Sequence, residues 1–227
     1  MDAPPTSENL QAYIGIARLL SKLGYSAPEI LAKDEAGGLA VIEDFGDDTY
    51  TRVLAADVAN EDTLYTLALD ILIDIHRHPS SGQLLPEYDD LRLLSEVALF
   101  VDWYLPAIRG NDLPAVARAE FLELWKPLLL VARKVPDGIV LRDFHVGNLM
   151  VLKNREGLRA CGLLDFQDAV FGPVTYDIVS LLEDARRDVS RELSHRLIRH
   201  YLDAFPTLDH DMFSASYAVL GAQRAMK

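Results

Sequence analysis

The sequence predicts an α+β protein in which short β-hairpins accompany a larger, mainly helical part. Two patterns lead to this prediction. Apolar residues recur every three or four positions in several long segments, as they do on the buried face of an amphipathic helix. Short apolar runs joined by glycine-containing turns occur twice, which is typical of antiparallel hairpins.

The first 45 residues predict a helix followed by a hairpin. The helix is expected from Ser7 to Leu23, with Ser7 as its N-cap and Gly24 as its stop. Residues 28–32 and 39–43 then read as two short strands, and Gly37-Gly38 supplies the turn between them. The outer edge of the first strand is expected to be open for pairing with further strands.

The rest of the chain is expected to be mainly helical. Apolar periodicity predicts helices at residues 63–76, 91–105, 121–132, from about 176 onwards, 191–201 and 213–227. Trp103 and Trp125 fall on helix faces and are expected in the core. His76 and His78 have no third metal ligand nearby, so we expect surface or helix-capping histidines.

A polar constellation interrupts the helical part. After a turn at residues 136–138, the apolar residues Val140 and Leu141 lead to Asp143 on a tight turn, and Asn148 follows five residues later. Residues 149–152 and 160–164 then predict a hairpin that ends on Asp165, so Asp143, Asn148 and Asp165 should meet at one end of two strands. Carboxylate and amide oxygens converging in this way suit Mg²⁺.

This spacing indicates phosphoryl transfer. In such a site, Asp143 accepts the proton of the attacking hydroxyl, while Asn148 and Asp165 hold the magnesium ion against the nucleotide phosphates. The alternative is that Asp143 and Asn148 are turn formers and that Asp165 is an acid at a strand end.

Composition restricts the partners. The formal net charge of −13 over 227 residues argues against nucleic acid or an anionic membrane as a partner, but not against ATP, whose phosphates are carried by the metal. The single cysteine, Cys161, sits in a predicted buried strand; it excludes an internal disulfide and fits a reducing cytoplasm.

Three segments resemble the aminoglycoside phosphotransferase-like kinases, a small-molecule branch of the protein-kinase fold: residues 42–50, 141–148 and 165–188. The resemblance implies a protein-kinase-like fold with residues 1–45 as a remnant of the N-terminal lobe and residues 46–227 as a helical catalytic lobe. It also implies that the backbone of Glu43, Asp44 and Phe45 forms the hinge that holds adenine; the alternative for the two acids is a solvated strand end.

The resemblance further implies ATP and Mg²⁺ as cofactors and a small-molecule sugar as substrate. The family usually has His-Gly before the catalytic acid, where this chain has Leu141-Arg142. That departure favours the amino-sugar kinases of bacterial cell-wall recycling, which act on the anomeric hydroxyl of N-acetylmuramate or N-acetylglucosamine. By the same resemblance, Asp177 braces the catalytic loop and the charged cluster at residues 184–188 lies near the substrate, while a solvated helix face would explain this cluster equally well.

Three alternatives stay open. The substrate could be an aminoglycoside, or a small alcohol such as choline or homoserine. The chain also contains neither a glycine-rich phosphate loop nor a plausible strand lysine ahead of the first helix. Glu8 is a candidate partner for such a lysine, but an interaction of its carboxylate with the helix dipole better explains its place near the helix start. We therefore expect a fragment that lacks part of each end and binds nucleotide weakly, and a catalytically inactive binding module is the third alternative.

Overall fold

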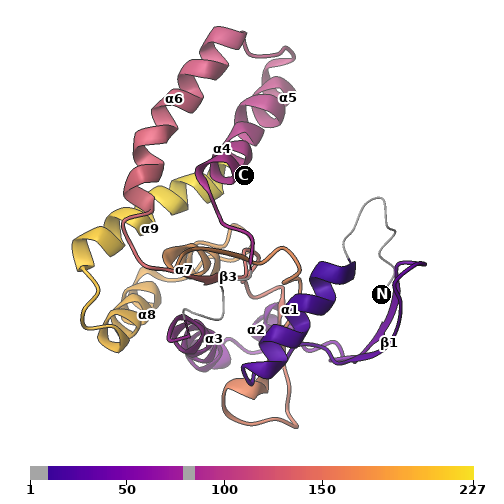
Figure 1. Ribbon diagram of the computed structural model, residues 1–227. Helices are drawn as coiled ribbons and strands as arrows, with labels where there is room; N and C mark the ends of the chain where they lie inside the picture. Colours follow the sequence, from indigo (N-terminus) through magenta and orange to yellow (C-terminus); the bar gives the residue numbers. More distant parts are fainter. Residues whose placement is uncertain (1–9, 79–84) are drawn as a thin grey trace.

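The computed structural model describes residues 10–78 and 85–227, in an α+β arrangement that is mostly helical (Figure 1). The strands of this part form three two-stranded antiparallel sheets. The pairs are β1 (Ile30–Asp34) with β2 (Leu39–Ile42), β3 (Asp137–Val140) with β6 (Val170–Pro173), and β4 (Leu149–Val151) with β5 (Cys161–Leu163). The predicted mixture of helices and hairpins is thus confirmed.

Helix α1 (Leu10–Lys22) packs on the first hairpin, as the sequence predicts. Leu10 and Ile14 of the helix form a small buried cluster with Ala40 of β2. Gly38 supplies the left-handed turn residue between the strands, with φ of 69°. The predicted N-cap Ser7, and Glu8, lie outside the described residues.

The β4–β5 hairpin forms where the sequence predicts it, with Leu149 paired with Leu163, and its turn includes a short 3-10 helix at Gly157–Ala160. The β3–β6 pair was not predicted, because Gly172-Pro173 reads as a turn. In the structure Gly172 pairs with Gly138, and a Cβ atom at Gly172 would lie 2.6 Å from the Cβ of Tyr88. This glycine therefore serves close packing within a strand and does not mark a turn.

The main core surrounds α3 (Glu61–His76), which follows α2 (Tyr50–Ala56) and a 3-10 turn at Val58–Asn60. Helices α7 (Thr175–Leu182), α8 (Arg191–Ala204) and α9 (His210–Met226) complete the body of the molecule (Figure 1). His76 was expected at the surface or at a cap, but it is buried and its Nδ1 lies 2.8 Å from the hydroxyl of Tyr201. None of the described helices is both long and apolar enough to cross a bilayer.

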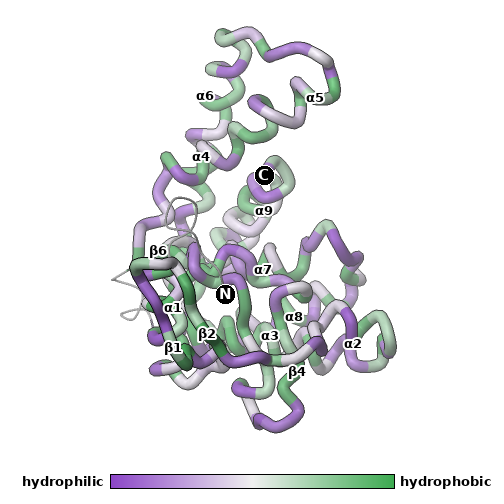
Figure 2. Tube along the Cα trace, turned by 90° about the vertical axis from the view of Figure 1, so that its right-hand side faces the viewer, coloured by the Kyte–Doolittle hydropathy of each residue, from purple (hydrophilic) through white to green (hydrophobic). Residues whose placement is uncertain are grey.

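Helices α4 (Asp90–Leu99), α5 (Leu105–Arg109) and α6 (Ala115–Ala132) project from the body as an arm (Figures 1 and 2). Trp125 lies in the core as predicted, but Trp103 is 74% exposed, so that prediction was wrong. Trp103 belongs to a π-helical turn at Phe100–Tyr104. A π-helical turn contains one residue more than an α-helical turn. The side chains in and after it therefore no longer point in the same direction as Leu93 and Val97, which pack in the core.

Candidate functional site

Asp143 lies in the loop between β3 and β4, which is folded into successive tight turns. The backbone N–H of Asp143 donates to the carbonyl of Leu141 at 2.9 Å, and the N–H of Asn148 donates to the carbonyl of His145 at 2.8 Å. The Asp143 side chain is 32% exposed, so its carboxylate is accessible from the surface while its backbone is fixed.

A buried carboxylate from helix α7 holds the start of this loop. Asp177 accepts the backbone N–H of Leu141 at 2.5 Å and that of Arg142 at 2.9 Å. Arg142 has φ of 69°, a left-handed conformation that costs a non-glycine residue energy and requires support. Burial raises the pKa of Asp177 to about 7, although hydrogen bonds from the two backbone N–H groups act in the opposite direction and lower it. The structure thus has the bracing contact that the resemblance implies.

Asn148 connects the loop to the end of β5. Its side-chain Nδ2 donates to the backbone carbonyl of Asp143 at 3.0 Å and to Oδ2 of Asp165 at 3.2 Å. The pairing of Leu149 with Leu163 places these residues at the same end of the hairpin. Asp165 has φ of 57°, and its Oδ1 accepts a hydrogen bond from Gln167 at 2.8 Å.

The side-chain oxygen atoms of Asn148 and Asp165 are of the chemical type that binds a magnesium ion. Among the residues that the structure describes, no group of three or more His, Cys, Asp or Glu side chains converges as a metal cage. Mg²⁺ does not require one, because it usually binds through one or two carboxylates and completes its shell with water and substrate phosphates. In Asn148, both amide hydrogens point to protein acceptors, which leaves the amide oxygen as the atom that could face a cation.

His145 is a buried residue that the sequence reasoning missed. Burial lowers its pKa, and the positive charge of Arg186 lowers it further, so its imidazole is neutral near pH 7. Its Nδ1 accepts the backbone N–H of Gly147 at 3.2 Å, so its proton is on Nε2. The 3.3 Å contact between that Nε2 and Asn148 Nδ2 then joins two donors and is packing, not a hydrogen bond.

Helix α9 also reaches the loop, through an arginine for which the sequence gives no signal beyond its place on a helix. Arg224 donates from Nη1 to the carbonyl of Arg142 at 3.0 Å and to the hydroxyl of Tyr176 at 3.3 Å. Its Nη2 lies 4.0 Å from Oδ1 of Asp143. The positive charge of Arg224 therefore lies beside the Asp143 carboxylate.

The side chain of Arg142 turns away from the solvent into a polar cluster between the loop, α4 and α9. It forms an ion pair with Glu96, which also accepts hydrogen bonds from the Tyr88 hydroxyl at 2.6 Å and from Gln223 at 2.9 Å. The arginine that replaces the glycine usual in the resembled family is therefore a structural residue here.

A cavity of about 810 Å³ opens beside Asp143, between the end of α7 and helix α9. Its walls include Glu183, Asp184, Arg186, Tyr217 and Arg224. The predicted charged cluster is divided: Asp184 and Arg186 face the cavity, whereas Arg187 pairs with Glu61 at 2.6 Å. The helix was expected to run through this cluster, but α7 ends at Leu182.

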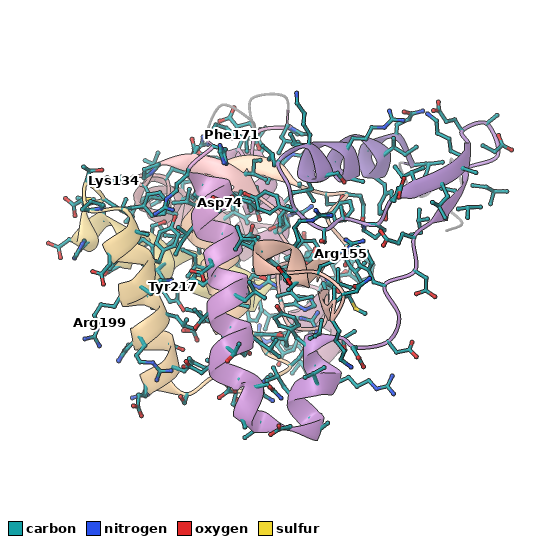
Figure 3. The ribbon with its side chains drawn as sticks, turned by 90° about the horizontal axis from the view of Figure 1, so that it is seen from below. Asp74, Lys134, Arg155, Phe171, Arg199 and Tyr217 are labelled. Carbon is teal, nitrogen blue, oxygen red and sulfur yellow. The ribbon has the colours of Figure 1, made fainter. Side chains whose placement is uncertain are left out.

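The predicted hinge residues follow β2 as an irregular segment. Glu43 forms an ion pair with Arg155 at the far end of the β4–β5 hairpin, and the Arg155 guanidinium lies 5.2 Å from the centre of the Phe45 ring. Figure 3 shows Arg155 beside this hairpin, far from Arg199, which extends from α8. Asp44 accepts the N–H of Gly46 at 2.8 Å, as a turn residue does. Nucleotide contacts of these three residues remain a prediction.

Comparison with known proteins places this geometry in context. A family model described as the phosphotransferase enzyme family matches residues 1–210. An N-acetylmuramate/N-acetylglucosamine kinase from Caulobacter vibrioides is 41% identical over 94% of this chain, which spans 60% of that relative's length.

Solved structures show the same fold. A choline kinase from Streptococcus pneumoniae superposes with a TM-score of 0.63 at 17% identity, over 96% of this chain and 72% of that one. An aminoglycoside phosphotransferase from Streptomyces rimosus, in complex with ADP and streptomycin, gives a TM-score of 0.57 at 17% identity, over 93% of this chain and 82% of that one. The predicted kinase-like α+β fold is confirmed.

Proposed function

Because the chain belongs to the phosphotransferase enzyme family, we propose that its protein transfers the γ-phosphoryl group of ATP to a hydroxyl of a small molecule. The observation that carries this proposal is the contact of Asn148 with both Asp165 and the backbone of Asp143. It joins a candidate proton acceptor and two candidate metal ligands through one amide.

Each of these residues has a chemical role in the proposal. Asp143 accepts the proton of the acceptor hydroxyl, and its carboxylate faces the cavity in which that hydroxyl would be presented. Asn148 and Asp165 would hold Mg²⁺, which supplies charge neutralisation at the nucleotide phosphates. Arg224 places a positive charge beside the Asp143 carboxylate and orients the loop through the carbonyl of Arg142.

We propose an amino sugar as the acceptor, N-acetylmuramate or N-acetylglucosamine, on the basis of the relative from Caulobacter vibrioides. The cavity beside Asp143 is large enough for an N-acetylated hexose, and its mixed polar walls suit a polyhydroxylated ligand. An anomeric hydroxyl is more acidic than an ordinary alcohol, so a carboxylate can serve as the base that deprotonates it.

Transfer of radiolabelled phosphate from ATP tests the proposal in the full-length gene product. We expect turnover of N-acetylmuramate or N-acetylglucosamine in the presence of Mg²⁺ and its loss with EDTA. Asp143→Asn should lower kcat by at least a hundredfold without changing thermal unfolding. Asp70→Asn is the matched control, because Asp70 is an exposed acid that pairs with His200 on the surface of α3. Most of the activity surviving in Asp143→Asn would contradict the assigned base.

An aminoglycoside is the second candidate acceptor. The acids Glu183 and Asp184 in the cavity wall, together with the formal net charge of −13, would attract a polycationic substrate. A panel that contains kanamycin-type amines beside the two acetylated sugars separates the candidates. Sugar or nucleotide binding by calorimetry without any transfer would instead identify a binding module.

A further inference from the structure

Arg186 is an exposed arginine held against a buried acid. Its guanidinium Nη1 donates to Oδ1 of Asp184 at 3.0 Å, and its own backbone N–H donates to the same oxygen at 3.1 Å. The Arg186 side chain is 63% exposed, whereas that of Asp184 is only 1% exposed. The buried carboxylate thus fixes one side of the guanidinium and leaves the other side toward the solvent.

Most donors of this guanidinium are unused. Within the described part of the chain, Asp184 is the only hydrogen-bond partner of Arg186, so the Nε and Nη2 hydrogens have no protein acceptor. Arg224, the other arginine of the cavity, is 14% exposed and already bonded to the loop and to Tyr176. Arg186 is therefore the better placed of the two arginines to meet a ligand.

The location of Arg186 indicates which ligand it meets. It lines the same cavity as Asp143, the proposed proton acceptor. Of the residues that the structure describes, those lining this cavity include neither Asn148 nor Asp165. Because the proposed base lines this cavity, we assign the cavity to the acceptor of the reaction.

The charges of the cavity wall leave Arg186 as the cation best able to receive an anion. The wall contains three acids, Asp143, Glu183 and Asp184, and three basic residues, Arg186, Arg224 and Lys227. Arg224 is bonded to the loop and Lys227 pairs with Glu96, so an acidic acceptor, which the acids would repel, finds its compensating cation in Arg186. A guanidinium with two adjacent free N–H groups binds a carboxylate through two parallel hydrogen bonds, which a lysine ammonium cannot reproduce.

We propose that Arg186 binds a carboxylate of the acceptor and thereby makes the enzyme prefer an acidic amino sugar to a neutral one. This inference depends on the proposed function, because it assigns specificity within the acceptor site of that reaction. Asp184 is the positioning residue that holds the guanidinium in place.

N-acetylmuramate and N-acetylglucosamine form a matched pair for the test, because the first carries a lactyl carboxylate that the second lacks. For Arg186→Gln we expect the KM for N-acetylmuramate to rise about tenfold or more, since a charge-assisted contact is lost. The KM values for N-acetylglucosamine and for ATP should change less than about twofold. Arg186→Lys should restore only part of the preference. Arg118→Gln is the control, because Arg118 is an exposed arginine that pairs with Asp102 on the arm.

Three results would overturn the proposal. An equal rise in both acceptor KM values would assign Arg186 a general structural role. A fall in kcat for both acceptors at constant KM would place it on the transferred phosphoryl group. Unchanged kinetics would show that it contacts neither. Absence of transfer by the unmodified enzyme would instead refute the proposed function. Calorimetric binding of N-acetylmuramate to the unmodified protein and to Arg186→Gln would still test the role of Arg186, and an equal affinity of the two proteins would count against it.

Discussion

Replacing Asp177 isolates the contact that supports the strained backbone before Asp143. The carboxylate accepts two buried N–H groups, from Leu141 and Arg142, and the second of these residues has φ of 69°. Asp177→Ala removes both acceptors, whereas Asp177→Asn keeps one oxygen and turns an amide NH₂ toward the other N–H. The two substitutions therefore differ by one hydrogen bond at nearly the same position.

The magnitude follows from the number of donors left without a partner. A buried N–H that loses its acceptor costs about 1–3 kcal/mol, so Asp177→Asn should destabilise the fold by about that amount and Asp177→Ala by about twice as much. Against a total stability of about 5–15 kcal/mol, the alanine variant should remain folded in most of this range. Release of Arg142 should also displace Asp143, so kcat should fall by about a hundredfold while the KM for ATP changes little.

Urea unfolding at pH 8 measures the stability, because burial raises the pKa of Asp177 to about 7 and the carboxylate is then ionised in the folded protein. Phosphate transfer measures kcat on the same samples. Asp211→Asn is the matched control: Asp211 also lies in the first turn of a helix, but it is exposed. If Asp177→Ala cost less than about 1 kcal/mol, or if Asp177→Asn retained the native kcat, the loop would be held by other contacts and the reasoning would fail.

Two further predictions concern the body of the molecule, one on close packing and one on the pH dependence of stability. A Cβ at Gly162 would lie 2.7 Å from the Phe45 ring, so Gly162→Ala should destabilise the fold by about 1–3 kcal/mol, whereas Gly15→Ala, in open space on α1, should be neutral or slightly stabilising. Urea unfolding compares them, and equal effects would contradict the close approach. Burial lowers the pKa of His76 to about 4, so as pH falls from 6.5 to 4 the unfolded chain gains a proton that the folded one does not. Stability should therefore drop across this window by up to about 3 kcal/mol more in the native protein than in His76→Gln, as measured by urea unfolding at several pH values. Parallel pH profiles for the two proteins would show that His76 titrates normally.

Local patterns predicted the parts of the fold that depend on neighbours in sequence. The β4–β5 hairpin, helix α3 and the first hairpin follow from apolar periodicity and turn glycines, and the contact of Asn148 with Asp165 follows from the hairpin register. These features involve residues fewer than about twenty positions apart, or repeat at a fixed period, so a single sequence contains their signal.

Features that depend on distant partners were missed or misjudged. The β3–β6 pair depends on Tyr88 packing against Gly172, and the exposure of Trp103 depends on a π-helical turn with no clear composition of its own. Arg224 and Arg142 contact each other across 82 residues, and neither residue type nor spacing indicates that contact. Polar groups that meet through tertiary packing leave no periodic trace in the chain.

The link between Arg224 and the carbonyl of Arg142 has a consequence for biosynthesis. A ribosome delivers the loop that carries Asp143 long before it delivers α9, so the nascent chain exposes a loop whose cavity wall is still missing. The proposed acceptor site is therefore completed only when α9, the last described helix, docks. A polypeptide interrupted between α8 and α9 would keep the hairpin and its three polar side chains, yet it would have no enclosed place for an acceptor to bind.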